Sequence, residues 1–392
     1  MSLINKPLVV EKFKSFYNYV KDNDGKIGTK QRGIDLNLNN ACNLRCQHCF
    51  TNSSKGENVK PVLPLDVVER VANEAHELGI FEWDLQGGEL VTRPKILYDT
   101  LKAMKTERFY VYLTTNGWYM TDEIAQNLAD LGVNRVSVSI DSMQSEVHDR
   151  FRGRKGSWQR AIDALEMVQK VGISPYLNIT VGHYNAKSED VKLLLDYSKD
   201  KKYTTLLNVA TPGGMWAKMT DIMVDEDDKA YLIEMRKKYK NILRNLWNPF
   251  DRAREAVLGC NTVNRLYITP IGDVLVCPYV HIKIGNVIEQ SLKQISENGF
   301  KIKHFSNHSP KCLAGEDKDF VKAIKNLLDI NGIWVLEQSD LGSMLESNSF
   351  DTICHEHLEY YSLSVINILL KQNNLRIFDA ELNASNGGSH RI

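Results

Sequence analysis

The chain has 392 residues, with 49 basic and 49 acidic side chains, so its formal net charge is zero. This balance gives no electrostatic reason to expect nucleic acid or an anionic membrane as a partner. No run reaches the roughly eighteen apolar residues of a membrane span, and residues 1–14 lack the apolar core of a secretory signal, so we expect a cytoplasmic location.

Strand-like runs alternate with amphipathic helical patterns from about residue 32 onward. The strand-like runs are residues 33–40, 80–88, 109–117, 135–141, 175–182 and 203–210. Helical patterns lie between them, for example at 64–79, which starts at Pro64, and at 157–171, which has Ser157 as a cap. This alternation predicts a parallel sheet with helical crossovers. Six units are too few for a closed eight-stranded barrel, and the pattern alone fits a doubly wound sheet and a partial barrel equally well.

The pattern changes after about residue 212. A long charged helix is expected at 225–247, starting at Asp225, and residues 265–280 predict a β-hairpin with "PIGD" as its turn. A helix around 290–300 leads to Cys312. The tail is expected to contain a helix at 319–330, a strand at 332–338 and a helix at 363–373.

Three of the seven cysteines lie close together in "ACNLRCQHCF" (41–50), as Cys42, Cys46 and Cys49. Three thiolates would ligate three irons of a four-iron cluster and leave the fourth iron open to a substrate or cofactor. The cysteines follow the first predicted strand, at the end of the sheet where parallel α/β folds place their chemistry. The alternative is a zinc site with His48 as its fourth ligand. His48 is adjacent to Cys49, however, and neighbouring side chains rarely point at one ion, so the spacing favours iron.

The spacing of these cysteines resembles the CxxxCxxC signature of the radical S-adenosylmethionine (radical SAM) superfamily. The resemblance implies a partial six-stranded (β/α) barrel, a [4Fe–4S] cluster on Cys42, Cys46 and Cys49, and SAM at the open iron. It also implies an external electron donor, such as flavodoxin or ferredoxin, and cleavage of SAM to a 5′-deoxyadenosyl radical that abstracts hydrogen from a substrate. The family often has an aromatic residue just before the third cysteine, near the adenine, and His48 occupies that place here.

The sequence "QGGE" (86–89) ends the second predicted strand. Two glycines let a backbone approach a ligand closely, and a carboxylate can accept hydrogen bonds from an ammonium group. By the same resemblance, Gly87, Gly88 and Glu89 form the element that receives the methionine amino group. Without the resemblance, a strand-ending turn explains these residues equally well.

Three further residues are candidates for the SAM site. The resemblance implies that Ser139, on the fourth predicted strand, contacts SAM and that Arg152 pairs with the methionine carboxylate. Asn116, in "TTNG" after the third predicted strand, is the other candidate. The alternatives are that Arg152 is a surface arginine and that Asn116 is a turn residue.

A second cysteine set flanks the predicted hairpin. Eleven residues separate Cys260 from Gly272, and four separate Gly272 from Cys277. This spacing resembles the opening of the SPASM or twitch extension of many radical SAM enzymes, which carries an auxiliary iron–sulfur cluster, and Cys312 would be a third ligand. The other SPASM cysteines are absent, so the single-cluster twitch type fits better. The fourth site would be open to substrate, or filled by another side chain or by Cys354; the alternative is three buried free cysteines.

The tail resembles the middle of sugar C-methyltransferases, SAM-dependent enzymes that act on keto-deoxysugar nucleotides. In "CHEHLEYYS" (354–362), Glu356 and His357 match that family's catalytic pair, and Cys354 stands where the family commonly has tyrosine. No glycine-rich cofactor loop precedes this segment, so we expect a fragment without methyltransferase activity. It would dock on the barrel, pair with another chain, or record a gene rearrangement or chimeric assembly.

These resemblances divide the chain into four parts. They are an N-terminal extension at 1–30, a radical SAM (β/α)6 core at 31–215, a linker helix with a small α+β SPASM/twitch-like auxiliary domain at 216–318, and an α/β C-terminal fragment at 319–392.

The sequence therefore favours a radical SAM enzyme that acts on a small molecule, and the tail suggests a sugar or nucleotide-sugar of surface polysaccharide biosynthesis. The alternatives are a peptide-modifying SPASM-type maturase, a sugar C-methyltransferase, and a non-catalytic iron–sulfur or zinc protein. Residues Asn178, Thr180, His183 and Asn208, on or after the fifth and sixth predicted strands, are candidates to face the substrate. No side chain is assigned as catalytic. Oxidation, epimerisation, elimination and methylthiolation all remain open as outcomes of hydrogen abstraction.

Overall fold

The computed structural model describes residues 6–51, 53, 62–216, 219–306, 308–317 and 319, together with short strands at 337–339, 381–383 and 389–391. The chain divides into two compact units, Met1–Val321 and Lys322–Ile392. We describe each unit by itself. None of the helices that the structure describes is both long enough and apolar enough to cross a membrane.

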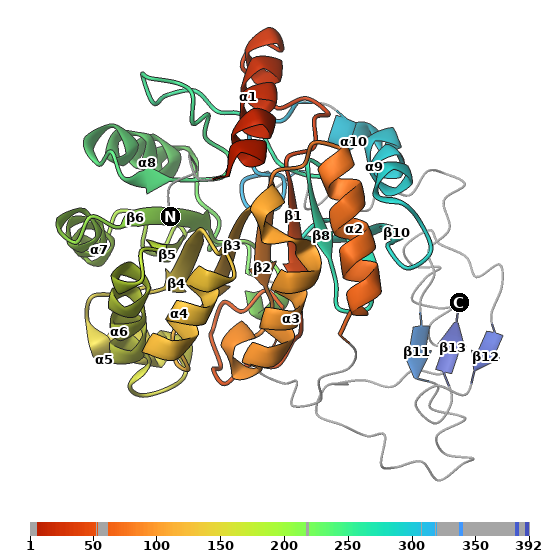
Figure 1. Cartoon of the computed structure of the whole chain (residues 1–392). Coiled ribbons are helices and arrows are strands. Elements are labelled where there is room, and N and C mark those ends of the chain that lie inside the picture. The colour runs from red at the N-terminus through yellow and green to blue at the C-terminus, as the bar shows by residue number, and fades with distance from the viewer. Residues whose placement is uncertain are drawn as a thin grey trace. The chain divides into compact units, whose positions relative to one another are not determined.

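The first unit is built on six parallel strands that alternate with helices (Figure 1). The strands are β1 (Gly33–Asn37), β2 (Glu82–Gln86), β3 (Tyr110–Thr115), β4 (Arg135–Ser139), β5 (Ser174–Val181) and β6 (Thr204–Val209). The helices between them are α2 (Leu65–Glu77), α3 (Pro94–Met104), α4 (Asp122–Asp130), α5 (Ser145–Arg152), α6 (Ser157–Lys170) and α7 (Glu189–Asp200). Each strand pairs in parallel with the next in chain order, and the sheet does not close on itself within the described residues. The six predicted strands are thus all present, as a partial barrel.

Side chains alternate across these strands. In β2, Trp83 and Leu85 are fully buried and belong to the apolar core between sheet and helices, whereas Glu82, Asp84 and Gln86 point the other way. Strands that are apolar on both faces are the usual pattern in parallel sheets. The polar residues at every second position therefore mark the inner face of the barrel as a polar one.

The N-terminal extension contains a helix, α1 (Pro7–Asp22), which the sequence analysis did not predict. Phe16 and Val20 of α1 pack against Phe81 and Leu258. Just before the helix, the Lys6 ammonium donates to three backbone carbonyls and to Asn134 Oδ1 at 2.7–2.8 Å. Burial lowers the pKa of Lys6 to about 8. This segment is therefore anchored to the start of the barrel rather than loosely attached.

Two helix predictions need correction. The N-cap of α6 is Gly156, and Ser157 is the first helical residue, whose hydroxyl donates to Asp149. The helix expected at 225–247 is α8 (Glu226–Lys238), which starts at the predicted place because Asp225 forms a capping box, but ends nine residues early. The chain turns extended at the buried Tyr239 and forms β7 (Ile242–Leu243), which pairs with β6.

The predicted hairpin is present as β8 (Arg265–Ile268) and β9 (Asp273–Cys277), and β10 (Val280–Asn286) continues it. Gly272 closes the turn with a positive φ of 85°, which favours glycine. Because β8 pairs in parallel with β1, the strands β8, β9 and β10 extend the barrel sheet at one edge and, with β7 at the other edge, bring it to ten strands within the described residues. Helices α9 (Leu292–Lys301) and α10 (Lys303–Ser306) follow.

In the second unit the structure describes a three-stranded antiparallel sheet. Its order is β11 (Glu337–Ser339), β13 (Ser389–Arg391) and β12 (Glu381–Asn383). β11 overlaps the end of the strand expected at 332–338. The helices expected at 319–330 and 363–373, apart from residue 319, lie outside the described residues, as do Cys354, Glu356 and His357.

Candidate active site

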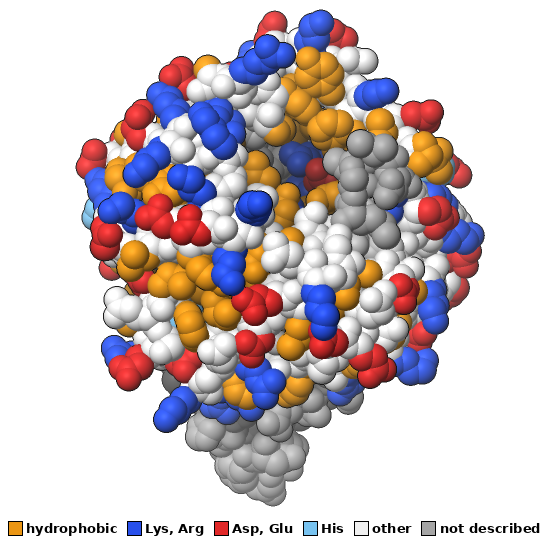
Figure 2. Space-filling model, turned by 60° about the vertical axis from the view of Figure 1, so that its left-hand side comes forward, with side chains coloured by type: hydrophobic (Ala, Val, Ile, Leu, Met, Phe, Trp, Pro, Cys, Tyr) orange, Lys and Arg blue, Asp and Glu red, His pale blue; other side chains and the backbone are white. Residues whose placement is uncertain are grey.

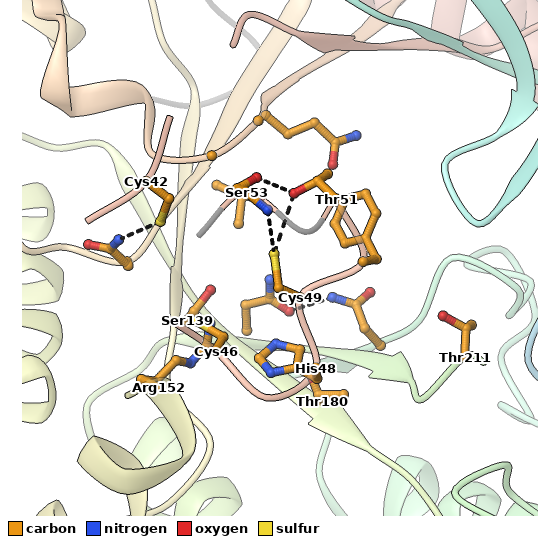
Figure 3. Close-up of a pocket in the computed structure, with 18 of the residues that line it drawn as sticks. Cys42, Cys46, His48, Cys49, Thr51, Ser53, Ser139, Arg152, Thr180 and Thr211 are labelled. Atoms are coloured by element: carbon orange, nitrogen blue, oxygen red, sulfur yellow. Dashed lines mark hydrogen bonds between the residues drawn. The ribbon is translucent and has the colours of Figure 1, made fainter. Parts of the chain in front are cut away.

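The loop after β1 brings the first three cysteines to one cavity of about 140 Å³ (Figure 3). The predicted cluster and cofactor residues that line this first cavity are Cys42, Cys46, His48, Cys49, Gly87, Gly88, Asn116, Ser139 and Arg152. They come from the ends of β1 to β4 and from α5, which are far apart in the sequence. The residues predicted for the first cluster and for SAM are therefore gathered in one place, with Glu89 as the exception.

The cysteine loop is fixed by backbone and side-chain hydrogen bonds. Arg45 N and Gln47 N donate to the carbonyls of Arg152 and Phe151 at the end of α5, at 3.1 and 3.0 Å. Each sulfur also faces a donor: Asn116 Nδ2 lies 3.9 Å from Cys42 Sγ, Arg152 Nη1 lies 3.7 Å from Cys46 Sγ, and Ser53 N lies 3.3 Å from Cys49 Sγ. Hydrogen bonds to cysteine sulfur are among the means by which proteins tune iron–sulfur clusters.

The chemistry of these thiols fits an iron cluster. Burial raises the pKa of Cys42 to about 12 and also raises the pKa of Cys46. Such thiols ionise when the charge of a bound metal stabilises the thiolates. Arg152, beside Cys46, is a permanent cation that acts in the same direction. A bound metal group, together with Arg152, would therefore supply the positive charge that the thiolates need.

The spacing of the sulfurs disfavours a single zinc ion. Among the described residues, one trio of His, Cys, Asp or Glu ligands has its atoms within 4.8 Å of one another, and it is His183, Asp225 and Asp228. At least two of the cysteine sulfurs are thus more than 4.8 Å apart, which is wider than the about 4 Å that tetrahedral zinc requires. A four-iron cluster binds each cysteine at a different iron and accommodates wider spacing. Asp225 and Asp228 of that trio form the capping box of α8, which explains why these two carboxylates lie close together.

Gly87 and Gly88 lie against the backbone that precedes Cys42. Gly88 N donates to Asn39 O, and Glu89 N donates to Ala41 O, both at 2.7 Å. A Cβ atom on Gly88 would lie 2.0 Å from the Ala41 carbonyl oxygen, which is far inside van der Waals contact. Only glycine therefore lets the end of β2 support the cysteine loop.

Glu89 differs from the expectation. It is 1% exposed and is absent from the cavity lining. Its carboxylate accepts hydrogen bonds from Thr115 Oγ1 at 2.6 Å, Asn116 N at 2.7 Å and Val91 N at 3.2 Å. Although these bonds favour the ionised form, burial dominates and raises the pKa of Glu89. The carboxylate thus lies beneath the cavity, where it joins the end of β3 to the turn after β2.

His48 belongs to an aromatic cluster at the rim of the first cavity. Its ring stacks on Phe151, with centroids 4.7 Å apart and an angle of 8° between planes, and Trp216 lies 5.7 Å away. Burial lowers the pKa of His48 to about 3, so the ring is neutral. A neutral stacked imidazole behaves here as an aromatic surface and not as a charged group.

The second cysteine set lines an adjacent cavity of about 200 Å³, inside the barrel. Cys260, Cys277 and Cys312 all border it, and burial raises the pKa of Cys277 and that of Cys312, the latter to about 12. No fourth cysteine stands among the residues described around this site. The residues that line both cavities are Phe50, Gln86, Thr114, Asn178, Asn208, Val209 and Tyr279. Each cysteine set therefore lines one of two neighbouring cavities that share a wall.

Among the predicted substrate-facing residues, Asn178, Thr180 and Asn208 line the first cavity. His183 does not, because its ring points to Asp228 at 2.8 Å on an exposed part of the surface. Sequence reasoning missed the polar residues of β1 to β4 that line the second cavity, such as Asp84 and Arg135. Their alternation with apolar residues was the available signal. Figure 2 shows a hollow in one face of the molecule, with charged side chains at its bottom and hydrophobic side chains around it.

Comparison with protein families agrees with this geometry. Residues 36–197 match the radical SAM superfamily, and residues 260–314 match the SPASM iron–sulfur cluster-binding domain. The first match contains the first cysteine loop, and the second contains Cys260, Cys277 and Cys312. The cofactors that these domains imply are a [4Fe–4S] cluster with SAM and auxiliary iron–sulfur clusters.

Curated relatives have varied activities. The chain is 28% identical, over 68% of its length and 82% of the relative, to the AdoMet-dependent heme synthase of Methanosarcina barkeri. It is 23% identical, over 70% of its length and 61% of the relative, to the subtilosin biosynthesis protein AlbA of Bacillus subtilis. The name of the first refers to heme synthesis and that of the second to the biosynthesis of a bacteriocin, so the two names point to different products.

Solved structures share the fold. Streptococcus suis SuiB bound to the precursor peptide SuiA is matched with a TM-score of 0.54 and 18% identity, over 71% of this chain and 67% of that one. The structure named anSMEcpe, with bound AdoMet and a peptide, is matched with a TM-score of 0.54 and 14% identity, over 76% and 98%. This likeness shows the partial-barrel fold, and the domain matches, a radical SAM domain at residues 36–197 and a SPASM domain at residues 260–314, identify the chain as a radical SAM enzyme.

Proposed function

We propose that this enzyme cleaves SAM reductively and uses the 5′-deoxyadenosyl radical to abstract hydrogen from a small polar substrate in the barrel. When bound, the [4Fe–4S] cluster would pass one electron from an external donor, such as flavodoxin or ferredoxin, to the SAM sulfonium. That electron would allow the C–S bond of SAM to break into methionine and the radical, and transfer of one substrate hydrogen atom would give 5′-deoxyadenosine. The observation that carries this proposal is the pair of adjacent cavities, each lined by one of the two cysteine sets.

The residues of the first cavity have distinct parts in this proposal. Cys42, Cys46 and Cys49 would hold the cluster. The backbone at Gly87 and Gly88 can approach a ligand because no Cβ intervenes. The cofactor-binding group would also include His48, Asn116, Ser139 and Arg152, which line the same cavity. Their task is to orient SAM and to exclude water from the radical.

In the second cavity, we propose that Cys260, Cys277 and Cys312 hold the auxiliary cluster. The wall shared by the two cavities would bind the substrate. Gln86, Thr114, Asn178 and Asn208 give it amide and hydroxyl groups, which suit a substrate with several hydroxyls. A sugar or nucleotide-sugar has such groups, and the resemblance of the tail to sugar C-methyltransferases points to the same class.

The test is anaerobic reconstitution with iron and sulfide, followed by iron counting and assay of 5′-deoxyadenosine with dithionite. The intact chain is compared with the triple variants C42A/C46A/C49A and C260A/C277A/C312A. We expect about eight irons in the intact chain and about four in each variant. 5′-Deoxyadenosine should be lost in the first variant. Metal binding without 5′-deoxyadenosine in the intact chain would contradict the proposal.

The substrate class is tested by deuterium transfer. With a sugar nucleotide deuterated on its ring carbons, deuterium should appear in 5′-deoxyadenosine. The parallel experiment replaces the sugar nucleotide with a mixture of deuterated peptides. Transfer only from the peptides would replace the sugar proposal with the peptide alternative and would leave the radical chemistry intact.

A further inference from the structure

Four residues on one level of the barrel face the second cavity. In the register of the sheet, Asp35 pairs with Asp84, Asp84 with Tyr112, and Tyr112 with Arg135. All four line the second cavity. This row places two carboxyl groups and a guanidinium group on one level inside the barrel, at the second cavity.

Three arginines line the second cavity, and two of them have carboxylate partners. Arg265 pairs with Asp35, and Arg244 Nη2 lies 2.8 Å from Glu316 Oε1. Arg135 has no ion pair and no side-chain hydrogen bond among the described residues, and its buried Nε lacks a partner. Yet Arg135 is only 8% exposed. Burying a charge without a counterion costs free energy, so the buried Arg135 guanidinium points to an interaction that the described residues do not supply.

Two tyrosines hold the Arg135 guanidinium in place. Its Cζ lies 3.7 Å from the centre of the Tyr112 ring and 4.3 Å from that of Tyr176. Stacking of this kind stabilises a cation and fixes its plane, but it supplies no acceptor for the N–H groups. The arrangement therefore presents a rigid, oriented donor to the cavity.

We infer that Arg135 is the anchor for an anionic group, a carboxylate or a phosphate, on the substrate. A planar guanidinium matches either group through two parallel N–H···O bonds, and the bound anion would supply the missing counter-charge. The inference rests on the proposed function in one respect, since it assumes that the second cavity holds the substrate.

The Asp84 carboxyl group is not the counterion of Arg135. Its carboxylate makes no ion pair within the described residues, and Oδ1 is buried without a partner. Burial, and then the neighbouring Asp35 carboxylate, raises the pKa of Asp84 to about 8. Near neutral pH the group is therefore mainly a neutral acid, which donates a hydrogen bond to an anion instead of repelling it.

The position of Arg135 also sets a direction for the substrate. Arg135 begins β4 and Ser139, which lines the first cavity, ends it. Four residues of strand span about 13 Å. An anionic group held at Arg135 leaves the rest of a small substrate to extend past Thr114 and Asn178 toward the first cavity. The atom that loses hydrogen would then lie at the end of the substrate away from the anion.

The test measures anion binding by thermal unfolding of the reconstituted full chain with SAM. The probes are inorganic phosphate and acetate, each against sodium chloride of equal ionic strength. The variants are Arg135→Gln, Arg135→Lys and, as a matched control, Arg252→Gln, which removes a charge from an exposed residue outside the cavity. Circular dichroism and iron content verify that each variant is folded and loaded.

We expect phosphate or acetate to raise Tm in the intact chain and in Arg252→Gln, and the active probe identifies the phosphate or carboxylate source. Arg135→Gln should weaken that binding about tenfold or more, and Arg135→Lys less. No anion-specific rise in the intact chain, or an equal rise in Arg135→Gln, would overturn the inference. If 5′-deoxyadenosine still forms in that case, the proposed function stands; if the anion binds at Arg135 but no 5′-deoxyadenosine forms, the proposed function fails alone.

Discussion

The Arg152 guanidinium lies 2.6 Å from the Asp141 carboxylate, and both side chains are more than nine-tenths buried. Arg152 Nε also donates to Asp141 Oδ2 at 2.7 Å, while Nη1 reaches toward Cys46 Sγ. Asp141, just after β4, therefore holds Arg152 in a fixed orientation at the cysteine loop. Arg152 can present its remaining N–H groups to a ligand in the first cavity without losing this support.

Asp141→Asn should lower the free energy of unfolding by about 3 kcal/mol, because it leaves a buried guanidinium without its counterion. Although burial opposes the effect, Arg152 keeps the pKa of Asp141 below its usual value. The stabilising pair is thus present at neutral pH and is lost as the pH falls, so the variant and the intact chain should converge in acid. Anaerobic urea denaturation at several pH values measures this.

The control for that measurement is Asp122→Asn, which breaks the exposed pair with Lys170 at 3.2 Å. An exposed pair contributes about 1 kcal/mol or less. Equal losses in the two variants would mean that burial of the Arg152 pair carries no special weight.

Glu89→Gln is expected to destabilise the protein by about 2 kcal/mol, because the new amide group would face donors where the carboxylate accepts three hydrogen bonds. Thr115→Val, which removes one of these donors, should have a smaller effect. The measurements are urea denaturation and SAM affinity. If Glu89→Gln weakens SAM binding without loss of stability, the carboxylate contacts the cofactor directly, as the sequence resemblance implied.

The sequence predicted the six strands of the barrel well because each is a short run bounded by helical patterns, whereas the choice of a partial barrel over a doubly wound sheet came from the family resemblance. The cysteine spacing likewise predicted the first site, since Cys42, Cys46 and Cys49 are local in sequence. The predicted end of α8 was wrong because the charge pattern typical of a helix continues past Lys238. The chain leaves the helix there to pair Ile242 with Thr205, and this pairing depends on β6, which is distant in the sequence. Secondary structure that tertiary pairing imposes leaves little local signal.

The arrangement of the second cavity was not predicted for a similar reason, although the alternation of polar and apolar residues indicated which side chains share a face of the sheet. Asp84, Tyr112 and Arg135 are separated by more than twenty residues at each step, and only the strand register places them on one level. The absence of a partner for Arg135 depends on which arginines Asp35 and Glu316 occupy. Which charged side chains pair with one another cannot be predicted from the spacing of residues in the sequence.

Gly88→Ala should displace the cysteine loop and lower the iron content, because the new Cβ would meet the Ala41 carbonyl group. The matched control is Gly79→Ala. Gly79 has a positive φ of 74° but nothing within 4 Å of an added Cβ, so this variant should lose about 1 kcal/mol of stability and keep its iron. Iron counting after reconstitution separates the two. Full iron content in Gly88→Ala would show that the loop can shift without losing its metal.

Asp84→Asn should change the pH dependence of stability in a defined direction. The pKa of Asp84 is about 8 in the folded chain, above its value of about 4 in the unfolded chain, so the folded state binds more protons between these values. Stability from this group therefore falls as the pH rises from about 4 to about 8. Asparagine keeps the shape of the neutral acid and cannot ionise, so the variant should lack this fall.

The charged and titratable groups that interact with Asp84 are Asp35, Glu82, Tyr112, Arg135, Arg265, Tyr267 and Tyr279. All remain in the variant, so the difference between the two unfolding curves isolates Asp84. The measurement is the unfolding free energy of intact and variant chains from pH 5 to pH 9. Parallel curves would show that Asp84 is already ionised near neutral pH. In that case Asp84 would repel an anion at Arg135, and a substrate that also carries a cationic group beside the anion would fit the cavity better.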